Sequence, residues 1–152
     1  MARNDQPLEY RAAAIGEIYE LRFEILRPKQ VPMKLHFPGD DGVPPATWHF
    51  GAFAGKRNVA CLTFFASTWE EKPALQLRGM AVAADHQSQG IGTRLLAAAS
   101  AGLAQVPGIP PLWWCNARVE AIRFYERNGW RVVSDAFMIA PVGLHKKMVR
   151  TP

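Results

Sequence analysis

Two hydrophobic periods alternate along the chain, and each change of period marks an expected element. Apolar residues spaced by three and four from Ile15 to Leu26 predict a helix over 12–26, which ends before Pro28. The same spacing from Ile91 to Leu103 predicts a helix over 90–105. The apolar or alternating runs expected as strands are 48–54, 59–66, 75–82, 112–115, 130–133 and 144–149.

A further helix is expected over 117–128, because Gly129 follows it at the position where helices commonly end. Run 112–115 is short, apolar and flanked by turn residues, as is typical of a buried parallel strand. The order of elements predicts an α/β (α+β) fold with a mixed, mostly antiparallel central sheet flanked by helices. We expect residues 1–152 to form a single domain.

Composition narrows the class of protein. Hydrophobic residues make up 49% of the chain and charged residues 20%, as in ordinary globular proteins. No apolar run approaches the ~20 residues of a membrane span, and the N-terminal sequence does not resemble a secretory signal. Cys61 and Cys115 lie in strand-like runs, so buried reduced thiols are expected, with no disulfide or metal site. The expected compartment is the cytoplasm.

The stretch from Leu75 to Thr93 passes from a strand through two glycines, Gly90 and Gly92, into a helix. A helix start presents unpaired backbone N–H groups, and glycine lets a bulky anion reach them. A P-loop is excluded because no Gly-Lys-Ser/Thr follows, and the dinucleotide fingerprint fails because Leu95 stands where its third glycine belongs. A ligand that carries phosphate is therefore expected. The net charge of +5 is compatible with such a ligand, or with nucleic acid.

The run Gln87-Ser88-Gln89-Gly90-Ile91-Gly92 resembles the acetyl-coenzyme A signature of the GNAT superfamily of N-acetyltransferases. Segment 112–130, which reads LWWCNARVEAIRFYERNGW, resembles the second signature of that superfamily. Runs 21–27 and 143–148 are similar to a small-molecule-type subgroup. The resemblance implies transfer of acetyl from acetyl-CoA to a primary amine by direct attack in a ternary complex, with no covalent nucleophile and no metal.

The resemblance also implies which residues hold acetyl-CoA. Backbone groups of the strand before the glycine turn would pair with the pantetheine arm, and backbone N–H groups of the turn would bind the pyrophosphate. Asn116 would bind the arm, cap the helix expected after it, or do both. The full set implied for the cofactor is Met80, Ala81, Val82, Gln87, Ser88, Gln89, Gly90, Ile91, Gly92, Thr93, Asn116 and Phe124.

The sequence indicates the catalytic groups less directly than the cofactor residues. Tyr125 matches the tyrosine with which many family members protonate the leaving thiolate, although it also fits a core position. Gln76 stands where some members have a glutamate base, and an amide cannot accept that proton. His145 and His49 are the candidate bases, because an imidazole titrates near neutral pH. A chain of waters without a single base stays open.

Other functions and partners are also open. Gln76 is equally compatible with a non-catalytic sensor that binds acyl-CoA on the same fold. Scattered lysines and arginines leave RNA binding as a less favoured hypothesis. Segment 27–47 is expected to be a loop beside the acceptor pocket, in which Asp40 and Asp41 form a solvated turn or attract a cationic amine. The small-molecule amine is not specified, and five tryptophans with strand edges leave a homodimer open.

Overall fold

The structure is a computed structural model, and it describes residues 6–26 and 37–151. The chain forms two compact units. The first comprises Met1–Thr63 and Gly79–Pro107, and the second comprises Phe64–Arg78 and Gly108–Pro152. Two long strands, β3 (Arg57–Trp69) and β4 (Lys72–Val82), contribute residues to both units.

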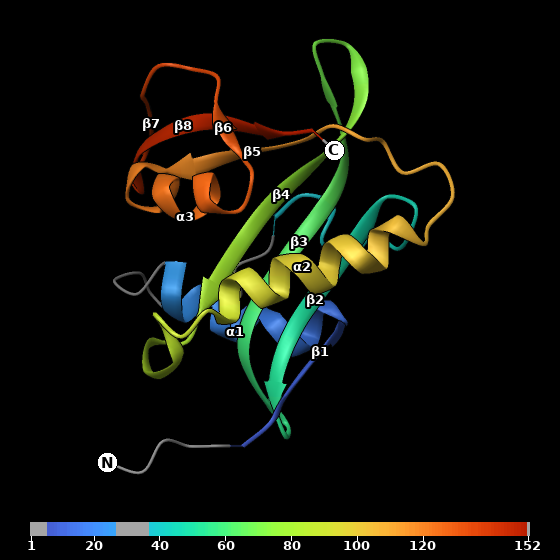
Figure 1. Cartoon of the computed structure of the whole chain (residues 1–152), viewed down its shortest axis with the longest axis vertical. Coiled ribbons are helices and arrows are strands. Elements are labelled where there is room, and N and C mark those ends of the chain that lie inside the picture. Colours follow the sequence, from blue (N-terminus) through green and yellow to red (C-terminus); the bar gives the residue numbers. More distant parts are fainter. Residues whose placement is uncertain (1–5, 27–36, 152) are drawn as a thin grey trace. The chain divides into compact units, whose positions relative to one another are not determined.

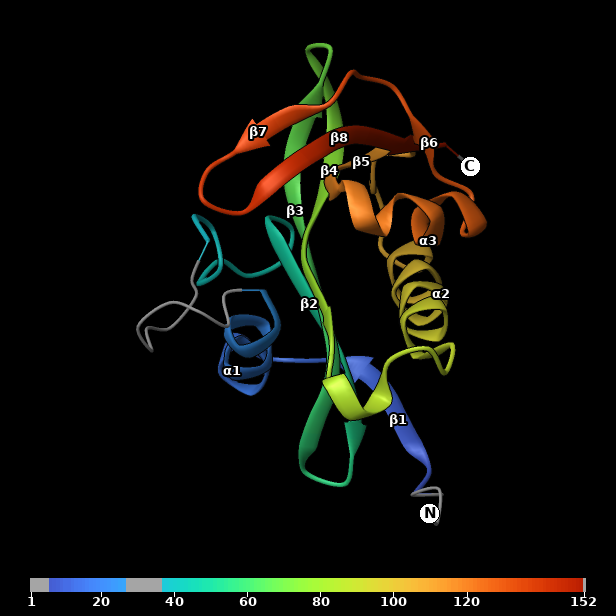
Figure 2. The same ribbon diagram turned by 90° about the vertical axis from the view of Figure 1, so that its left-hand side faces the viewer.

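In the first unit, helices cover both faces of the strands. Helix α1 (Ile15–Leu26) lies on one face and α2 (Ile91–Ala104) on the other, as Figures 1 and 2 show. Strand β2 (Thr47–Ala54) and the adjoining part of β3 are therefore buried on both faces, and they read as nearly continuous apolar runs. Strand β1 (Leu8–Ala12), which was not predicted, pairs with β2 in antiparallel register from Leu8↔Ala54 to Ala12↔Phe50.

The second unit is built around β5 (Trp113–Arg118). This strand runs parallel to β4 from Leu75↔Trp113 to Leu77↔Cys115, and antiparallel to β8 (Gly143–Arg150). Strands β6 (Arg131–Val132) and β7 (Phe137–Ile139) pair with β8. The 3₁₀ helix η2 (Val119–Ala121) leads into α3 (Ile122–Arg127).

The strands are hydrogen-bonded in the order β1-β2-β3-β4-β5-β8-β6, with β7 on β8. The predicted fold class, a mixed and mostly antiparallel sheet with flanking helices, is confirmed. The predicted parallel strand at 112–115 is confirmed as β5. Among the described residues, none of the helices combines the length and apolar character that crossing a membrane requires.

The helix predicted over 117–128 is wrong in its first part. Ala117 and Arg118 continue β5, because they pair with Lys146 and His145 of β8, and α3 begins only at Ile122. Pairing with a distant strand overrides the local helical pattern here. Asn116 lies within the strand and therefore does not cap a helix. Gly129 does follow α3, with a φ of 88° that favours glycine.

The link between the strands predicted over 59–66 and 75–82 is shorter than expected. Strand β3 continues to Trp69 and β4 begins at Lys72, so only Glu70 and Glu71 turn the chain. Both adopt positive φ, 48° and 68°, as tight hairpin turns require. This hairpin is hard to predict because two glutamates occupy positions that usually favour glycine or asparagine.

Candidate active site

The glycine turn enters α2 through two left-handed residues. Ser88 has a φ of 62° and Gly90, the N-cap of α2, a φ of 77°. No side chain caps this helix, so its first backbone N–H groups are not satisfied by a capping oxygen. Residues 87–90 are exposed, and a Cβ on Gly90 would meet nothing within 4 Å. This concave run of backbone donors at the positive end of a helix is suited to an anion.

A cavity of about 290 Å³ adjoins this turn. It includes two predicted cofactor residues, Gln89 and Ile91, and adds the cationic side chain of Arg94. Sequence reasoning missed Arg94, although a base in the first turn of a helix that binds phosphate is a recognisable signal. The remaining residues lining this cavity are Gln6, Pro7, Leu8, Tyr10 and His86.

Asp85 holds in place the short segment that leads from β4 into the glycine turn. Its carboxylate accepts two hydrogen bonds from Arg57, each 2.8 Å, and lies 2.9 Å from Nδ1 of His86. These partners hold the pKa of Asp85 well below its usual range, the hydrogen bonds from Arg57 being the largest cause. On the far side of the short 3₁₀ helix η1 (Ala84–His86), Gln87 donates from Nε2 to the carbonyl oxygen of Val82 at 3.0 Å.

Among the described residues, no strand pairs with the outer edge of β4 beyond Leu77. The ladder between β4 and β5 ends at Leu77, before the predicted pantetheine residues Met80, Ala81 and Val82. Gly79 interrupts the strand with a φ of 65°, which is typical of a bulge. Ala83 pairs through its N–H with Val59 of β3 at 2.8 Å, so the other edge of this segment is already occupied. An extended arm can pair with the outer edge only.

Beneath the bulge lies a buried network centred on Arg22. Its guanidinium donates from Nη1 to Asp40 at 2.6 Å and from Nη2 to the hydroxyl of Thr63 at 2.7 Å. Arg22 and Thr63 have no exposed surface and Asp40 is 1% exposed. A Cβ on Gly79 would lie 2.7 Å from Nε of Arg22, so a larger residue would displace the guanidinium. The prediction that Asp40 forms a solvated turn is therefore wrong.

His49 completes this network. Its Nε2 lies 2.9 Å from the carbonyl oxygen of Asp40, which can only accept, so Nε2 carries the proton. Its Nδ1 then accepts from the hydroxyl of Thr63 at 2.7 Å. Burial lowers the pKa of His49 below its ordinary value, so the ring is neutral at neutral pH. Both nitrogens are engaged, which favours a structural role for His49.

In the second unit, Tyr125 of α3 packs against one face of β5, and Asn116 of β5 projects from the other face. Trp113, Cys115 and Ala117 point to the buried face, where α3 places Tyr125. The ring of Tyr125 meets Phe124 and Trp130 edge to face, at centroid distances of 5.2 and 5.5 Å. Burial raises the pKa of Tyr125 above its ordinary value, so its hydroxyl stays protonated. Burial also raises the pKa of Cys115, to about 12.

His145 lies on the other face of the same strands, paired in register with Arg118. Its Nδ1 lies 2.8 Å from the carbonyl oxygen of Gly143. Because a carbonyl only accepts, Nδ1 carries the proton and the lone pair is on Nε2. No hydrogen bond within the described part of the chain occupies Nε2. Of the two predicted histidines, His145 is therefore the one arranged to accept a proton.

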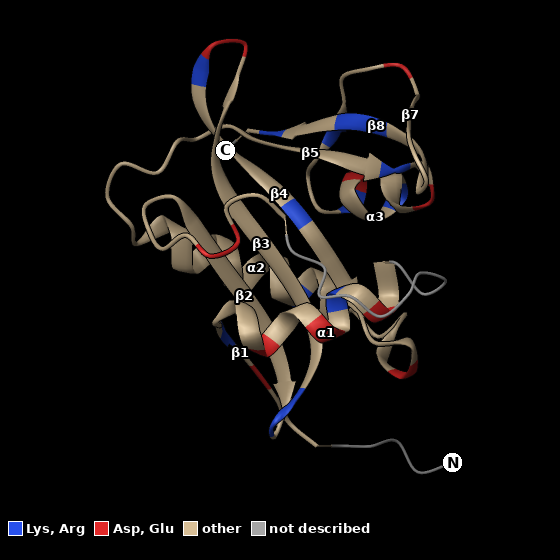
Figure 3. Ribbon diagram, turned by 180° about the vertical axis from the view of Figure 1, so that it is seen from behind, with Lys and Arg blue, Asp and Glu red and all other residues tan. Residues whose placement is uncertain are grey.

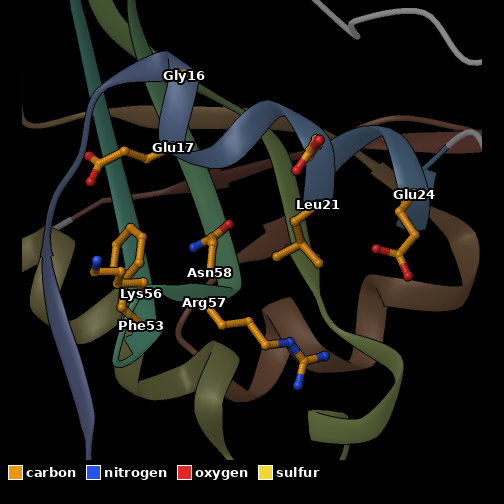
Figure 4. Close-up of a pocket in the computed structure, with 9 residues that line it drawn as sticks. Gly16, Glu17, Leu21, Glu24, Phe53, Lys56, Arg57 and Asn58 are labelled. Carbon is orange, nitrogen blue, oxygen red and sulfur yellow. The ribbon is translucent and has the colours of Figure 1, made fainter.

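A separate cavity of about 430 Å³ lies between α1 and the turn that joins β2 to β3 (Figure 4). Two of its charged side chains are engaged elsewhere, since Glu17 binds Arg11 at 2.8 Å and Arg57 binds Asp85. None of the predicted site residues lines it. The residues that line it are Gly16, Glu17, Glu20, Leu21, Glu24, Phe53, Lys56, Arg57 and Asn58.

The predicted site residues fall into two sets. The first unit holds His49 and the cofactor residues from Met80 to Thr93, and the second unit holds Asn116, Phe124, Tyr125 and His145. In the described ranges, no three His, Cys, Asp or Glu side chains gather in a way that could hold a metal ion.

Comparison with known proteins identifies the family. Residues 46–132 match the model of the acetyltransferase (GNAT) domain. The chain is 29% identical over 147 residues to the uncharacterized N-acetyltransferase YitI of Bacillus subtilis (strain 168), with 95% of this chain and 96% of that protein covered. The chain belongs to the GNAT acetyltransferase family, which transfers acyl groups from acetyl-CoA. The predicted family is confirmed.

Solved structures agree on the fold. Escherichia coli ElaA aligns with a TM-score of 0.75 at 14% identity, over 95% of this chain and 99% of that chain. Naa50 of Arabidopsis thaliana, solved with the bisubstrate analogue CoA-Ac-MVNAL, aligns with a TM-score of 0.67 at 14% identity, over 95% and 98% of the two chains.

The buried ion pair makes a testable prediction about stability. Replacing Asp40 with alanine leaves the guanidinium of Arg22 buried without its carboxylate, and we expect a loss of about 3–5 kcal/mol in the free energy of unfolding. Urea denaturation measures this loss. The matched control is Asp41→Ala in the same turn, where the side chain is exposed and a smaller loss is expected because its charge stays in contact with solvent. Equal effects of the two substitutions would contradict the assignment.

Proposed function

We propose that this protein is an N-acetyltransferase that moves acetyl from acetyl-CoA to a primary amine by direct attack in a ternary complex. One observation carries the proposal most directly. The uncapped start of α2, with left-handed Ser88 and Gly90, follows a strand whose outer edge is available. A phosphate-bearing end and an extended amide-bearing arm are the two ligand parts that these features fit. We further propose that residues 1–152 act as one domain.

The residues present fit acetyl-CoA. Backbone groups of Met80, Ala81 and Val82 would hold the pantetheine arm, except that the carbonyl oxygen of Val82 is already used by Gln87. Backbone N–H groups of Gln87, Ser88, Gln89, Gly90, Ile91, Gly92 and Thr93 would bind the pyrophosphate, and Arg94 adds a positive charge beside them. Asn116 and Phe124 are the further contacts proposed from the second unit. When bound, acetyl-CoA supplies the thioester whose acyl group is transferred.

The chain's own residues would then handle the protons. Nε2 of His145 takes a proton from the attacking amine, for which its tautomer is suitable. As the N–C bond forms and the C–S bond breaks, the hydroxyl of Tyr125 gives a proton to the departing sulfur. Burial keeps that hydroxyl protonated, because it raises the pKa of Tyr125. His49 is the second candidate base, and its two engaged nitrogens support it less well.

A second function, an acyl-CoA sensor without catalysis, is favoured by one observation. Gln76 is buried in β4, at 4% exposure, and its amide cannot accept the amine proton. A sensor would bind acetyl-CoA at one site per chain and release no thiol in the presence of any amine. Calorimetric titration together with a thiol-release assay distinguishes the sensor from the enzyme.

The phosphate assignment is tested at Gly90. Gly90→Glu places a carboxylate at the anion site, and Gly90→Gln gives the same size and backbone strain without the charge. We expect the glutamate variant to bind acetyl-CoA roughly 100-fold more weakly than the glutamine variant, from the repulsion of like charges in a partly desolvated site. Calorimetric titration measures both. Equal affinities would show that no phosphate lies at this turn.

The choice of base is tested by the pair His145→Gln and His49→Gln. We expect His145→Gln to lower kcat roughly 100-fold while the affinity for acetyl-CoA stays the same. The His49→Gln variant should keep the kcat of the wild type in the protein that remains folded, because both nitrogens of His49 are engaged in the buried network. The reverse pattern would assign the base to His49.

The general acid is tested by Tyr125→Phe, which removes only the hydroxyl from a buried ring. We expect kcat to fall roughly 10- to 100-fold while the dissociation constant of acetyl-CoA is unchanged. Steady-state kinetics and calorimetric titration separate the two quantities. An unchanged kcat would remove Tyr125 from the mechanism.

A further inference from the structure

The two faces of β5 differ in chemistry. Residues 113, 115 and 117 are buried, whereas Trp114, Asn116 and Arg118 alternate with them and are half-buried. The register with β8 places Asn116 opposite Lys147, and Arg118 opposite His145. Residues that are paired in register project from the same face of a sheet. One face of the second unit therefore gathers these four polar side chains with Trp114.

Aromatic rings and one ammonium form a continuous row on this face, which we call the aromatic row. Trp69 lies against Trp114 at a centroid distance of 5.6 Å. Nζ of Lys147 lies 4.8 Å from the ring of Trp114 and 5.5 Å from that of Phe137. Phe137 in turn lies 6.1 Å from His145. The aromatic row thus ends at the proposed base.

Within the described residues of the second unit, no carboxylate forms an ion pair with Lys147. Its Nζ lies 3.4 Å from the amide oxygen of Asn116, which carries no charge to balance it. The indole N–H of Trp114, also on this row, is buried without an acceptor in the described part of the chain. Strands β4, β5 and β8 carry basic segments and no acidic ones (Figure 3). A half-buried ammonium without a carboxylate partner is complemented by an anion.

The geometry points to the class of amine. We propose that the acceptor is an amino acid with an aromatic or large apolar side chain, whose carboxylate binds Lys147 and whose side chain packs on the aromatic row. Lys147 and His145 are two residues apart on one face of β8, a rise of about 7 Å. A bound molecule can therefore meet the ammonium with its carboxylate while its amine approaches Nε2 of His145. This inference rests on the proposed function, because it assigns a substrate to that site.

Activity with matched amines tests the inference. L-phenylalanine and phenethylamine differ only in the carboxylate, and glycine lacks the ring. We expect kcat/KM to be roughly 10- to 100-fold higher for L-phenylalanine than for either of the others. Lys147→Met should abolish the preference over phenethylamine. Lys146→Met is the matched control, because Lys146 pairs with Ala117 and projects from the opposite face, and it should keep the preference. Phenethylamine as the better substrate of the wild type would overturn the proposal.

A binding measurement separates this inference from the proposed function. N-acetyl-L-phenylalanine should quench tryptophan fluorescence through the aromatic row, and Lys147→Met should weaken its binding roughly 10- to 100-fold while leaving N-acetylphenethylamine unaffected. Calorimetry with acetyl-CoA is run in parallel. Loss of acetyl-CoA binding with retained binding of N-acetyl-L-phenylalanine would reject the proposed function and keep the carboxylate site. Normal acetyl-CoA binding without binding of N-acetyl-L-phenylalanine would reject only the inference.

The acyl group of the thioester is the other possible source of a carboxylate that binds Lys147. Succinyl-CoA, whose acyl group carries a carboxylate, distinguishes this source from the acceptor. We expect Lys147→Met to leave the calorimetric affinity for succinyl-CoA, relative to acetyl-CoA, unchanged. A selective loss of succinyl-CoA affinity, with binding of N-acetyl-L-phenylalanine intact, would place the carboxylate on the acyl group and overturn the acceptor assignment.

Discussion

The buried guanidinium of Arg22 is the constraint on which the first unit depends. A charge without exposed surface is tolerated only where an opposite charge and further hydrogen-bond acceptors lie beside it, so the surrounding elements must bring oxygens to it. Asp40 comes from the segment between α1 and β2, and Thr63 comes from β3. Gly79 of β4 contributes by lacking a side chain. One cation thus links a helix, a connecting segment and two strands.

That constraint also determines what His49 can do. Once Thr63 donates to Nδ1 and Asp40 accepts from Nε2, the imidazole has no lone pair left for an amine. The bulge at Gly79 that makes room for Arg22 lies immediately before Met80, where β4 leaves its outer edge available. The same packing therefore engages both ring nitrogens of His49. It also shapes the strand end that we propose as the binding site of an extended ligand. Structure and proposed chemistry share these residues.

The parts of the fold that the sequence revealed are those set by local pattern. The strand, glycine turn and helix around Gly90 were predicted within about three residues, because the periods are clear and glycine marks the left-handed turn. The family followed from two short signatures. The burial of Asp40 and the continuation of β5 through Arg118 were missed, since both depend on partners far away in the chain. Strands β1 and β7 are short and form by pairing with β2 and β8.

In the candidate site too, residue types are evident from the sequence, whereas the role of each side chain depends on partners that are distant in the chain. Sequence reasoning named His145 and His49 as equals, and only their hydrogen-bond partners distinguish an available lone pair from an occupied one. The sequence alone does not distinguish Lys147 from its neighbour Lys146, because the two side chains have the same chemistry. The register of β5 with β8 separates the two lysines onto opposite faces. A surface charge and a specificity residue can thus be adjacent in sequence and differ only by the pleat of the strand.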